Sequence, residues 1–113
     1  MSRRSRAREI AFQVLYQDDL NPGGDPGARD QFLRRRLDDD LYAFASELVA
    51  GVRRNRTELD ARLSETAEHW TLSRMAATDR NVLRLGAYEL LHTDTPERVV
   101  VDEAIELAKR YGT

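Results

Sequence analysis

The chain has 113 residues, of which 41% are hydrophobic and 34% charged, with a formal charge of −2. This length suits one domain over residues 1–113 and excludes a two-domain enzyme. The absence of cysteine excludes disulfides, thiolate metal sites and a cysteine nucleophile. No apolar run reaches the about 18 residues that span a bilayer, so we expect a cytoplasmic protein with no membrane association.

Apolar residues recur at helical spacing, and no alternating pattern is longer than residues 98–101. We therefore predict an all-α fold, a compact bundle of about six or seven helices. A helix that ends near Leu20 carries the first apolar stripe: Ala7, Ile10, Ala11, Val14 and Leu15. Proline and glycine in residues 21–27 predict a loop, and a short helix is expected around residues 31–37.

The remaining apolar stripes predict four more helices. One helix carries Leu41, Phe44, Ala45, Leu48 and Val52, and another carries Leu59, Leu63, Ala67 and Trp70. From Thr78, expected as its cap, a helix is apolar around most of its circumference, which indicates a central position and a close crossing at Gly86. The last helix follows Pro96 and is expected to bury Val101, Ala104, Ile105 and Ala108.

Positive charge is concentrated at the N-terminus. Residues 1–8 contain no acid and four arginines: Arg3, Arg4, Arg6 and Arg8. A helix N-terminus is already electropositive, so each arginine there is unfavourable by about 0.3–1 kcal/mol when poorly screened. The last helix instead has acids in its first turn and basic residues in its last. We infer that an anion docks at the first helix, and nucleic acid is the natural polyanion.

Two aromatic residues on the same helix favour unstacked bases. Phe12 and Tyr16 lie one turn apart, beside Gln13, and aromatic rings next to arginines suit single-stranded RNA. The sequence leaves open whether Phe12 is a contact residue or part of the core, and whether the basic start is simply solvated. The run Arg34 to Arg36, followed by Asp38 to Asp40, is interpreted as a self-neutralising surface without a site.

Motifs of catalysis and metal binding are lacking. His69 and His92 are far apart and neither has a second ligand at metal spacing. There is no glycine-rich phosphate loop, and Ser46 and Ser73 have no recognisable partner. We predict a protein that is not an enzyme and has neither metal nor cofactor.

Four strings resemble the NusB family of transcription antitermination factors in order and spacing. They are RRSRARE leading to QVLY, then LVAGV at residues 48–52, DRNVLRLGAYEL at 79–90 and VDEAIELAK at 101–109. The last two are the most specific. The resemblance covers nearly the whole chain.

The resemblance implies a non-catalytic helical factor that binds the boxA element of nascent ribosomal RNA together with ribosomal protein NusE, in an RNA polymerase antitermination complex. It implies that Arg3, Arg4, Arg6 and Arg8 contact RNA phosphates, with Gln13 and Tyr16 near bases. Asp79 and Arg80 are expected near the protein partner or the RNA. Whether the chain forms a homodimer stays open.

Family members continue past the position of Gly112 with a further helix, whereas this sequence stops at Thr113. We infer that the final helix is lacking, and expect an exposed apolar groove lined partly by the first or last helix. Two alternatives remain. The chain is the RNA-recognition domain of a ribosomal RNA cytosine methyltransferase, or it is a helical interaction module without an RNA role, in which Phe12 and Tyr16 contact protein.

Overall fold

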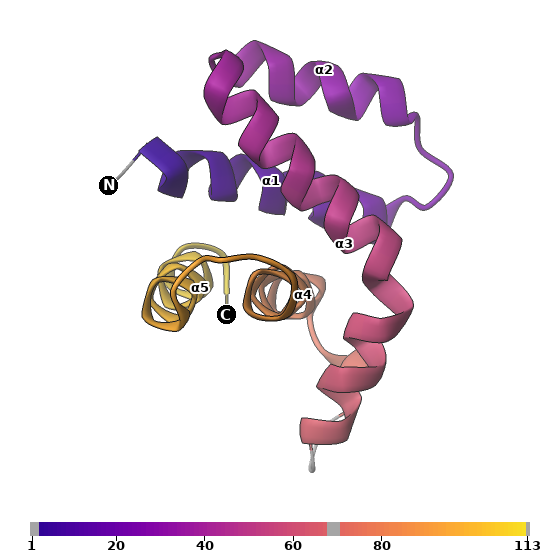
Figure 1. Cartoon of the computed structure of the whole chain (residues 1–113). Coiled ribbons are helices and arrows are strands. Elements are labelled where there is room, and N and C mark those ends of the chain that lie inside the picture. Colours follow the sequence, from indigo (N-terminus) through magenta and orange to yellow (C-terminus); the bar gives the residue numbers. More distant parts are fainter. Residues whose placement is uncertain (1–2, 68–70, 113) are drawn as a thin grey trace. The chain divides into compact units, whose positions relative to one another are not determined.

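The computed structural model describes residues 3–67 and 71–112, which form helices joined by short connections (Figure 1). Neither range contains a strand, which confirms the all-α class. In chain order the elements are α1 (Arg3–Leu20), α2 (Pro26–Arg36), α3 (Asp39–Thr66), the 3-10 turn η1 (Leu72–Arg74), α4 (Ala77–His92) and α5 (Glu97–Tyr111). Within the described ranges the α-helices are thus fewer than the six or seven expected.

α3 explains the lower number of helices. It is one continuous helix of 28 residues where the sequence suggested two. Residues 53–58, between the two apolar stripes, contain no proline or glycine, so nothing there interrupts the helix. Trp70, the last residue of the second stripe, lies outside the described residues.

The chain divides into two compact units, Met1–Ala50 and Gly51–Thr113. In the first unit α1 packs against α2, and all five residues of the predicted α1 stripe are buried. Phe12 is only 1% exposed and belongs to the core. The loop is shorter than predicted because α2 begins at Pro26, where the Asp25 carboxylate accepts a hydrogen bond of 2.9 Å from the Gly27 N–H.

In the second unit α4 packs against α5. A Cβ built on Gly86 would lie 3.8 Å from Val100 Cγ1 and 3.9 Å from Ala104 Cβ, so α5 passes Gly86 but leaves room for a methyl group, and the crossing does not require glycine. Gly51 is more restrictive. A Cβ there would overlap the ring end of Tyr88, whose side chain is buried. The glycine of the LVAGV string therefore makes room for an aromatic ring.

Two expectations about α4 are wrong. The helix begins at Ala77 and is preceded by Ala76 with no side-chain cap, so Thr78 lies inside the helix. The helix is also not buried all round, because Leu90 is 48% exposed and Leu91 is 42% exposed. Asp79 does lie in the first turn, where a carboxylate favours the helix dipole.

The predicted stripe on the last helix is wrong by one position. α5 buries Val100 and Leu107, seven residues apart, whereas Val101 is 44% exposed and Ile105 is 47% exposed. Val101 and Ile105 thus form an uncovered apolar strip on the last helix, one of the two helices for which such a surface was expected. The apolar stripe of α1 is covered.

The two helix glycines of the second unit make a matched pair for a stability test. Gly51→Ala should destabilise the protein by about 1–3 kcal/mol, because its methyl group overlaps the Tyr88 ring. Gly86→Ala finds ordinary contact distances and should be neutral or stabilising by up to about 1 kcal/mol. Urea unfolding followed by circular dichroism measures both, and equal effects would contradict the packing described for Tyr88.

Candidate nucleic-acid interface

The first turn of α1 gathers cations at an electropositive helix end. α1 begins at Arg3 and has no acid in its first turn. Its unpaired N–H groups and its arginines therefore carry the same sign of charge. A helix end of this kind is a ready place for an anion.

Three of the four predicted arginines are solvent-exposed. Arg3 Nη2 donates to Asp38 Oδ2, and the Arg3 side chain is still 69% exposed. Arg6 Nη1 lies 3.0 Å from Glu9 Oε1 and its side chain is 49% exposed. Arg4 lies over the ring of Phe44, with its guanidinium carbon 4.4 Å from the centroid.

Arg8 does not fit the expected role. Only 3% of it is exposed, and its guanidinium lies 5.2 Å from the centroid of the Phe44 ring. A side chain enclosed in this way cannot lie against an RNA phosphate, so the prediction for Arg8 needs correction. Arg8 directly follows Ala7, the first residue of the buried stripe, so the methylene groups of its side chain lie against the protein interior. Arg8 anchors α1 on α3.

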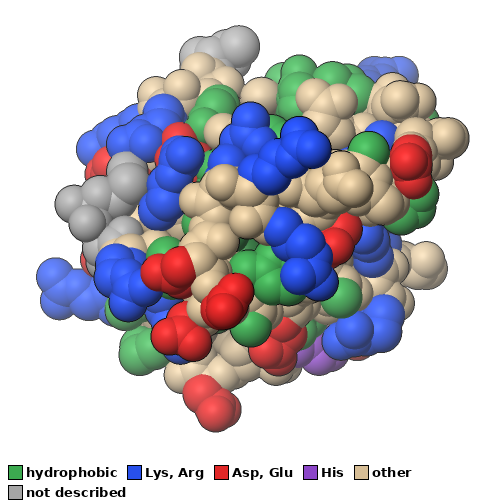
Figure 2. Space-filling view, turned by 90° about the horizontal axis from the view of Figure 1, so that it is seen from above, with side chains coloured by type: hydrophobic (Ala, Val, Ile, Leu, Met, Phe, Trp, Pro, Cys, Tyr) green, Lys and Arg blue, Asp and Glu red, His purple; other side chains and the backbone are tan. Residues whose placement is uncertain are grey.

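Two of these arginines form ion pairs. Arg3 pairs with Asp38 and Arg6 pairs with Glu9. Basic and acidic side chains also lie interspersed over the face shown in Figure 2. The Arg3–Asp38 pair is exposed on both sides, and a pair of this kind is weak and exchanges readily. A phosphate can therefore replace the carboxylate of Asp38 as the partner of Arg3. Glu9 is buried, so it stays the partner of Arg6, whose side chain is still 49% exposed to a second acceptor.

Gln13 and Tyr16 lie further along α1, and both are half-buried. The Tyr16 ring lies 6.2 Å from the ring of Phe12, centroid to centroid, at an interplanar angle of 33°. The buried ring of Phe12 thus supports the partly exposed ring of Tyr16. Since Gln13 and Tyr16 are three residues apart on one helix, they share a face.

Asp38 joins the start of α1 to the start of α3. Its Oδ1 accepts a 3.1 Å hydrogen bond from the Leu41 N–H, and its Oδ2 accepts from Arg3. The hydrogen bond from the Leu41 N–H holds the pKa of the Asp38 carboxyl below its ordinary value. Desolvation opposes this effect, and the Arg3 guanidinium lowers the pKa further. Nothing in the sequence indicates this link, because Asp38 lies in a run of alternating charge blocks that is typical of a solvated surface.

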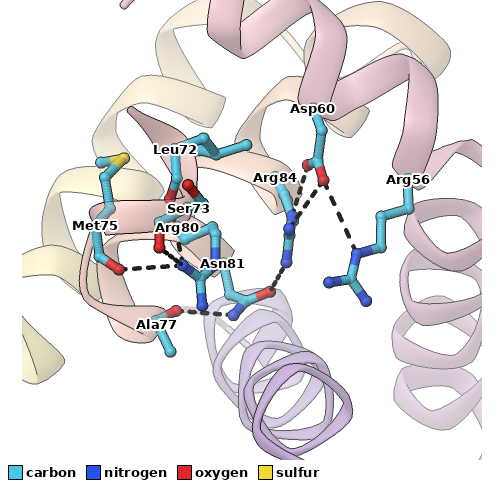
Figure 3. A network of polar contacts seen from close by, with 9 residues as sticks. All are labelled: Arg56, Asp60, Leu72, Ser73, Met75, Ala77, Arg80, Asn81 and Arg84. Carbon is cyan, nitrogen blue, oxygen red and sulfur yellow. Dashed lines mark hydrogen bonds and ion pairs between the residues drawn. The ribbon is translucent and has the colours of Figure 1, made fainter. Parts of the chain in front are cut away.

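The other predicted site residues, Asp79 and Arg80, belong to the second unit. Arg80 Nη1 donates to the carbonyl oxygens of Leu72, Ser73 and Met75, at 3.2, 3.4 and 3.1 Å (Figure 3). Arg80 therefore holds η1 and the residue after it in place. Asp79 is half-buried, and a Cβ built on Gly112 would lie 3.2 Å from its Oδ1.

A neighbouring polar network was missed by sequence reasoning. Arg84 is buried and donates to both carboxylate oxygens of Asp60, at 2.7 and 2.9 Å, and to Asn81 Oδ1 at 3.2 Å (Figure 3). Asn81 in turn donates to the Ala77 carbonyl at 2.7 Å. A bidentate pair of this kind fixes α4 on the second half of α3. Its only signal in the sequence was a charged residue in a largely apolar helix.

No helix in the described ranges is long and apolar enough to cross a membrane. Within residues 3–67 and 71–112, no group of three or more His, Cys, Asp or Glu side chains is arranged to hold a metal ion. His92 instead pairs with a carboxylate, its Nε2 lying 2.7 Å from Glu58 Oε1, and its ring stacks on Tyr88. His69 lies outside the described residues.

Comparison with known proteins agrees with this architecture. A model of the NusB family matches residues 5–113. The chain is 45% identical over 114 residues to a transcription antitermination protein NusB of Anaeromyxobacter dehalogenans, covering 99% of this chain and 80% of that protein. It is 35% identical over 115 residues to a protein of the same name from Bdellovibrio bacteriovorus, covering 100% of this chain and 85% of that protein.

Solved structures match as well. T. maritima NusB has a TM-score of 0.90 and 38% identity, and the match covers all of this chain and 80% of that one. A crystal structure of antitermination factors NusB and NusE in complex with double-stranded RNA has a TM-score of 0.84 and 31% identity, covering 98% and 84% of the two chains. The fold defines a small all-helical domain with a cationic helix start. The chain belongs to the NusB family.

The Asp38 link predicts a pH dependence of stability. Because the folded-state pKa is lower than the ordinary one, the Asp38 contribution is present above the ordinary carboxyl pKa and is lost as pH falls through the folded-state value. Asp38→Ala should therefore lower the urea midpoint at neutral pH, and the difference from wild type should vanish in strong acid. A difference that is the same at both pH values would contradict an ionised Asp38 as the cause.

The Arg84 network predicts a larger effect. Asp60→Asn leaves the buried Arg84 guanidinium without its counter-charge and should cost about 2 kcal/mol of unfolding free energy. The matched control is Asp102→Asn, which removes an exposed carboxylate 3.9 Å from Arg98 and should change stability by less than about 0.5 kcal/mol. If denaturant unfolding gives both variants the same stability, the network is no stronger than a surface pair.

Proposed function

We propose that this protein is a transcription antitermination factor that binds single-stranded boxA-type RNA of ribosomal RNA leaders together with ribosomal protein NusE. Family membership supports the proposal, as do relatives named transcription antitermination protein NusB. A structural relative was crystallised with NusE and RNA. The observation on this chain that carries the proposal is the start of α1, where Arg3, Arg4 and Arg6 are exposed and the first turn contains no acid.

The proposed roles follow the positions of the side chains. Arg3, Arg4 and Arg6 contact phosphates, and Arg3 exchanges the surface carboxylate of Asp38 for a phosphate oxygen when RNA binds. Gln13 and Tyr16 contact bases, the first by hydrogen bonding and the second by stacking. Arg8 holds α1 against α3 and thereby positions the other three arginines of the helix start.

The partner residues are proposed in the second unit. Asp79 and the segment that Arg80 holds, residues 72–75, contribute to the surface for NusE or for the RNA. In this role the protein is a non-catalytic scaffold of the RNA polymerase antitermination complex and works in the cytoplasm, where transcripts are made. The relatives reported above are antitermination proteins, which favours this role over that of a methyltransferase domain.

Titration with RNA tests the proposal. A boxA-type strand should bind more tightly than a scrambled strand of equal length when NusE is present, with an affinity that falls with salt by a slope of about −0.7 per neutralised phosphate. Arg6→Gln should flatten that slope by about 0.7. Arg98→Gln, which removes an exposed arginine from α5, is the control and should leave the slope unchanged.

Tyr16→Ala separates base contacts from phosphate contacts. Removing the ring should reduce the preference for boxA over the scrambled strand by about tenfold while the salt slope stays as in wild type. The proposal fails if the wild-type protein shows no preference for boxA with NusE present, or if Arg6→Gln and Arg98→Gln behave alike.

A further inference from the structure

The last turn of α2 carries a second group of exposed cations, Arg34, Arg35 and Arg36. Cations in the last turn of a helix interact favourably with its dipole. The helix dipole explains why cations occur in this turn. It does not explain their side-chain contacts, which differ among the three arginines.

Arg34 is fixed within the protein. Its Nε donates to Asp30 at 2.9 Å, and its guanidinium lies 4.2 Å from the centroid of the Tyr42 ring. The Tyr42 hydroxyl donates to the other oxygen of Asp30. Arg34 therefore serves the packing of α2 against the start of α3, and both its charge and its planar face are already in contact with protein groups.

Arg36 is held flat, with one side turned to solvent. Its guanidinium carbon lies 3.7 Å from the centroid of the Phe32 ring, and its Nη1 donates to the Phe32 carbonyl at 3.4 Å. Phe32 is half-buried and Arg36 is exposed, so the ring supports the guanidinium from the protein side. A guanidinium plane presented in this way is a surface on which a nucleic acid base stacks.

Arg35 is exposed, and among the described residues it has no ion pair or hydrogen bond to its side chain. Its fork of donors is therefore available for an oxyanion, and a phosphate accepts from it in bidentate geometry. One residue thus offers a phosphate contact and the next offers a stacking surface.

The two arginines adjoin the start of α1 within the first unit. Arg3 is bound to Asp38, which lies two residues after Arg36, or at most about 7 Å along the backbone. The ion pair therefore brings the last turn of α2 next to the first turn of α1. Asp39 and Asp40 follow in the first turn of α3 and repel phosphate, so they limit the cationic surface on that side.

We propose that the RNA strand bound at the start of α1 continues onto the last turn of α2, where Arg35 contacts a phosphate and the Arg36–Phe32 stack carries a base that flanks the boxA element. The inference rests on the proposed function and extends it to RNA outside boxA. An acidic peptide would satisfy the charge of Arg35 but would leave the stacking surface unused.

Fluorescence anisotropy with two RNA lengths tests the extension. One labelled strand carries boxA alone, about 12 nucleotides, and two others add about eight unstructured nucleotides at the 5′ or the 3′ end. Wild type, with NusE present, should bind one of the extended strands at least about fivefold more tightly than boxA alone. Its salt slope should be steeper by about 0.7.

Three variants test which side chains cause the tighter binding of the extended strand. Arg35→Gln should remove the extra slope on the extended strand and leave boxA alone unaffected. Arg36→Lys keeps the positive charge but removes the planar guanidinium group. It should therefore lower the affinity for the extended strand about fivefold while the salt slope stays unchanged. Arg62→Gln removes an exposed arginine from the second half of α3 and is the control for net charge.

The outcomes separate the two proposals. If wild type binds boxA alone but gains nothing from either extension, this inference is overturned and the proposed function stands. It is also overturned if Arg62→Gln weakens the extended strand as much as Arg35→Gln, or if polyglutamate competes as well as the flanking RNA. If boxA itself is not bound with NusE present, both proposals fall together.

Discussion

The ring of Phe44 holds the start of α1 in place without neutralising it. Arg4 and Arg8 both lie over this ring, one exposed side chain and one buried. A cation–π contact orients a guanidinium without supplying a counter-charge. Asp38 adds a second contact through Arg3. The helix start is therefore held by side-chain contacts while Arg3, Arg4 and Arg6 stay exposed, and the proposed contacts to RNA depend on that combination.

Periodicity predicted the fold well where one face of a helix is buried and poorly elsewhere. The α1 stripe is buried as predicted because α1 has a single apolar face. α5 has apolar residues on two adjoining faces, at Val100 and Val101, and periodicity alone does not say which one packs. The break expected within residues 53–58 does not occur, because a change of apolar face is not a helix breaker. Gly51 was visible in the sequence, but its fit to Tyr88 depends on tertiary contact.

The location of the candidate site stays a prediction from the sequence, whereas the surroundings of its side chains come from the structure. The cluster of arginines without acids was sufficient to point to α1, because charge is a property of composition. The burial of Arg8 and the partners of Arg3 and Arg6 depend on residues elsewhere in the chain, namely Phe44 and Asp38, and on the turn geometry of α1. The same holds for Arg36. Its ring partner lies four residues earlier on α2, and only the side-chain conformation shows that the two stack.

A nuclear magnetic resonance titration of the arginine Nε–H signals with boxA RNA and NusE would show directly which guanidinium groups meet the RNA. The signals of Arg3, Arg4 and Arg6 should shift on adding RNA, because their guanidinium groups exchange solvent or a surface carboxylate for phosphate. The buried Arg8 signal should stay in place. A shift of Arg8 together with unmoved signals of Arg3, Arg4 and Arg6 would contradict the account.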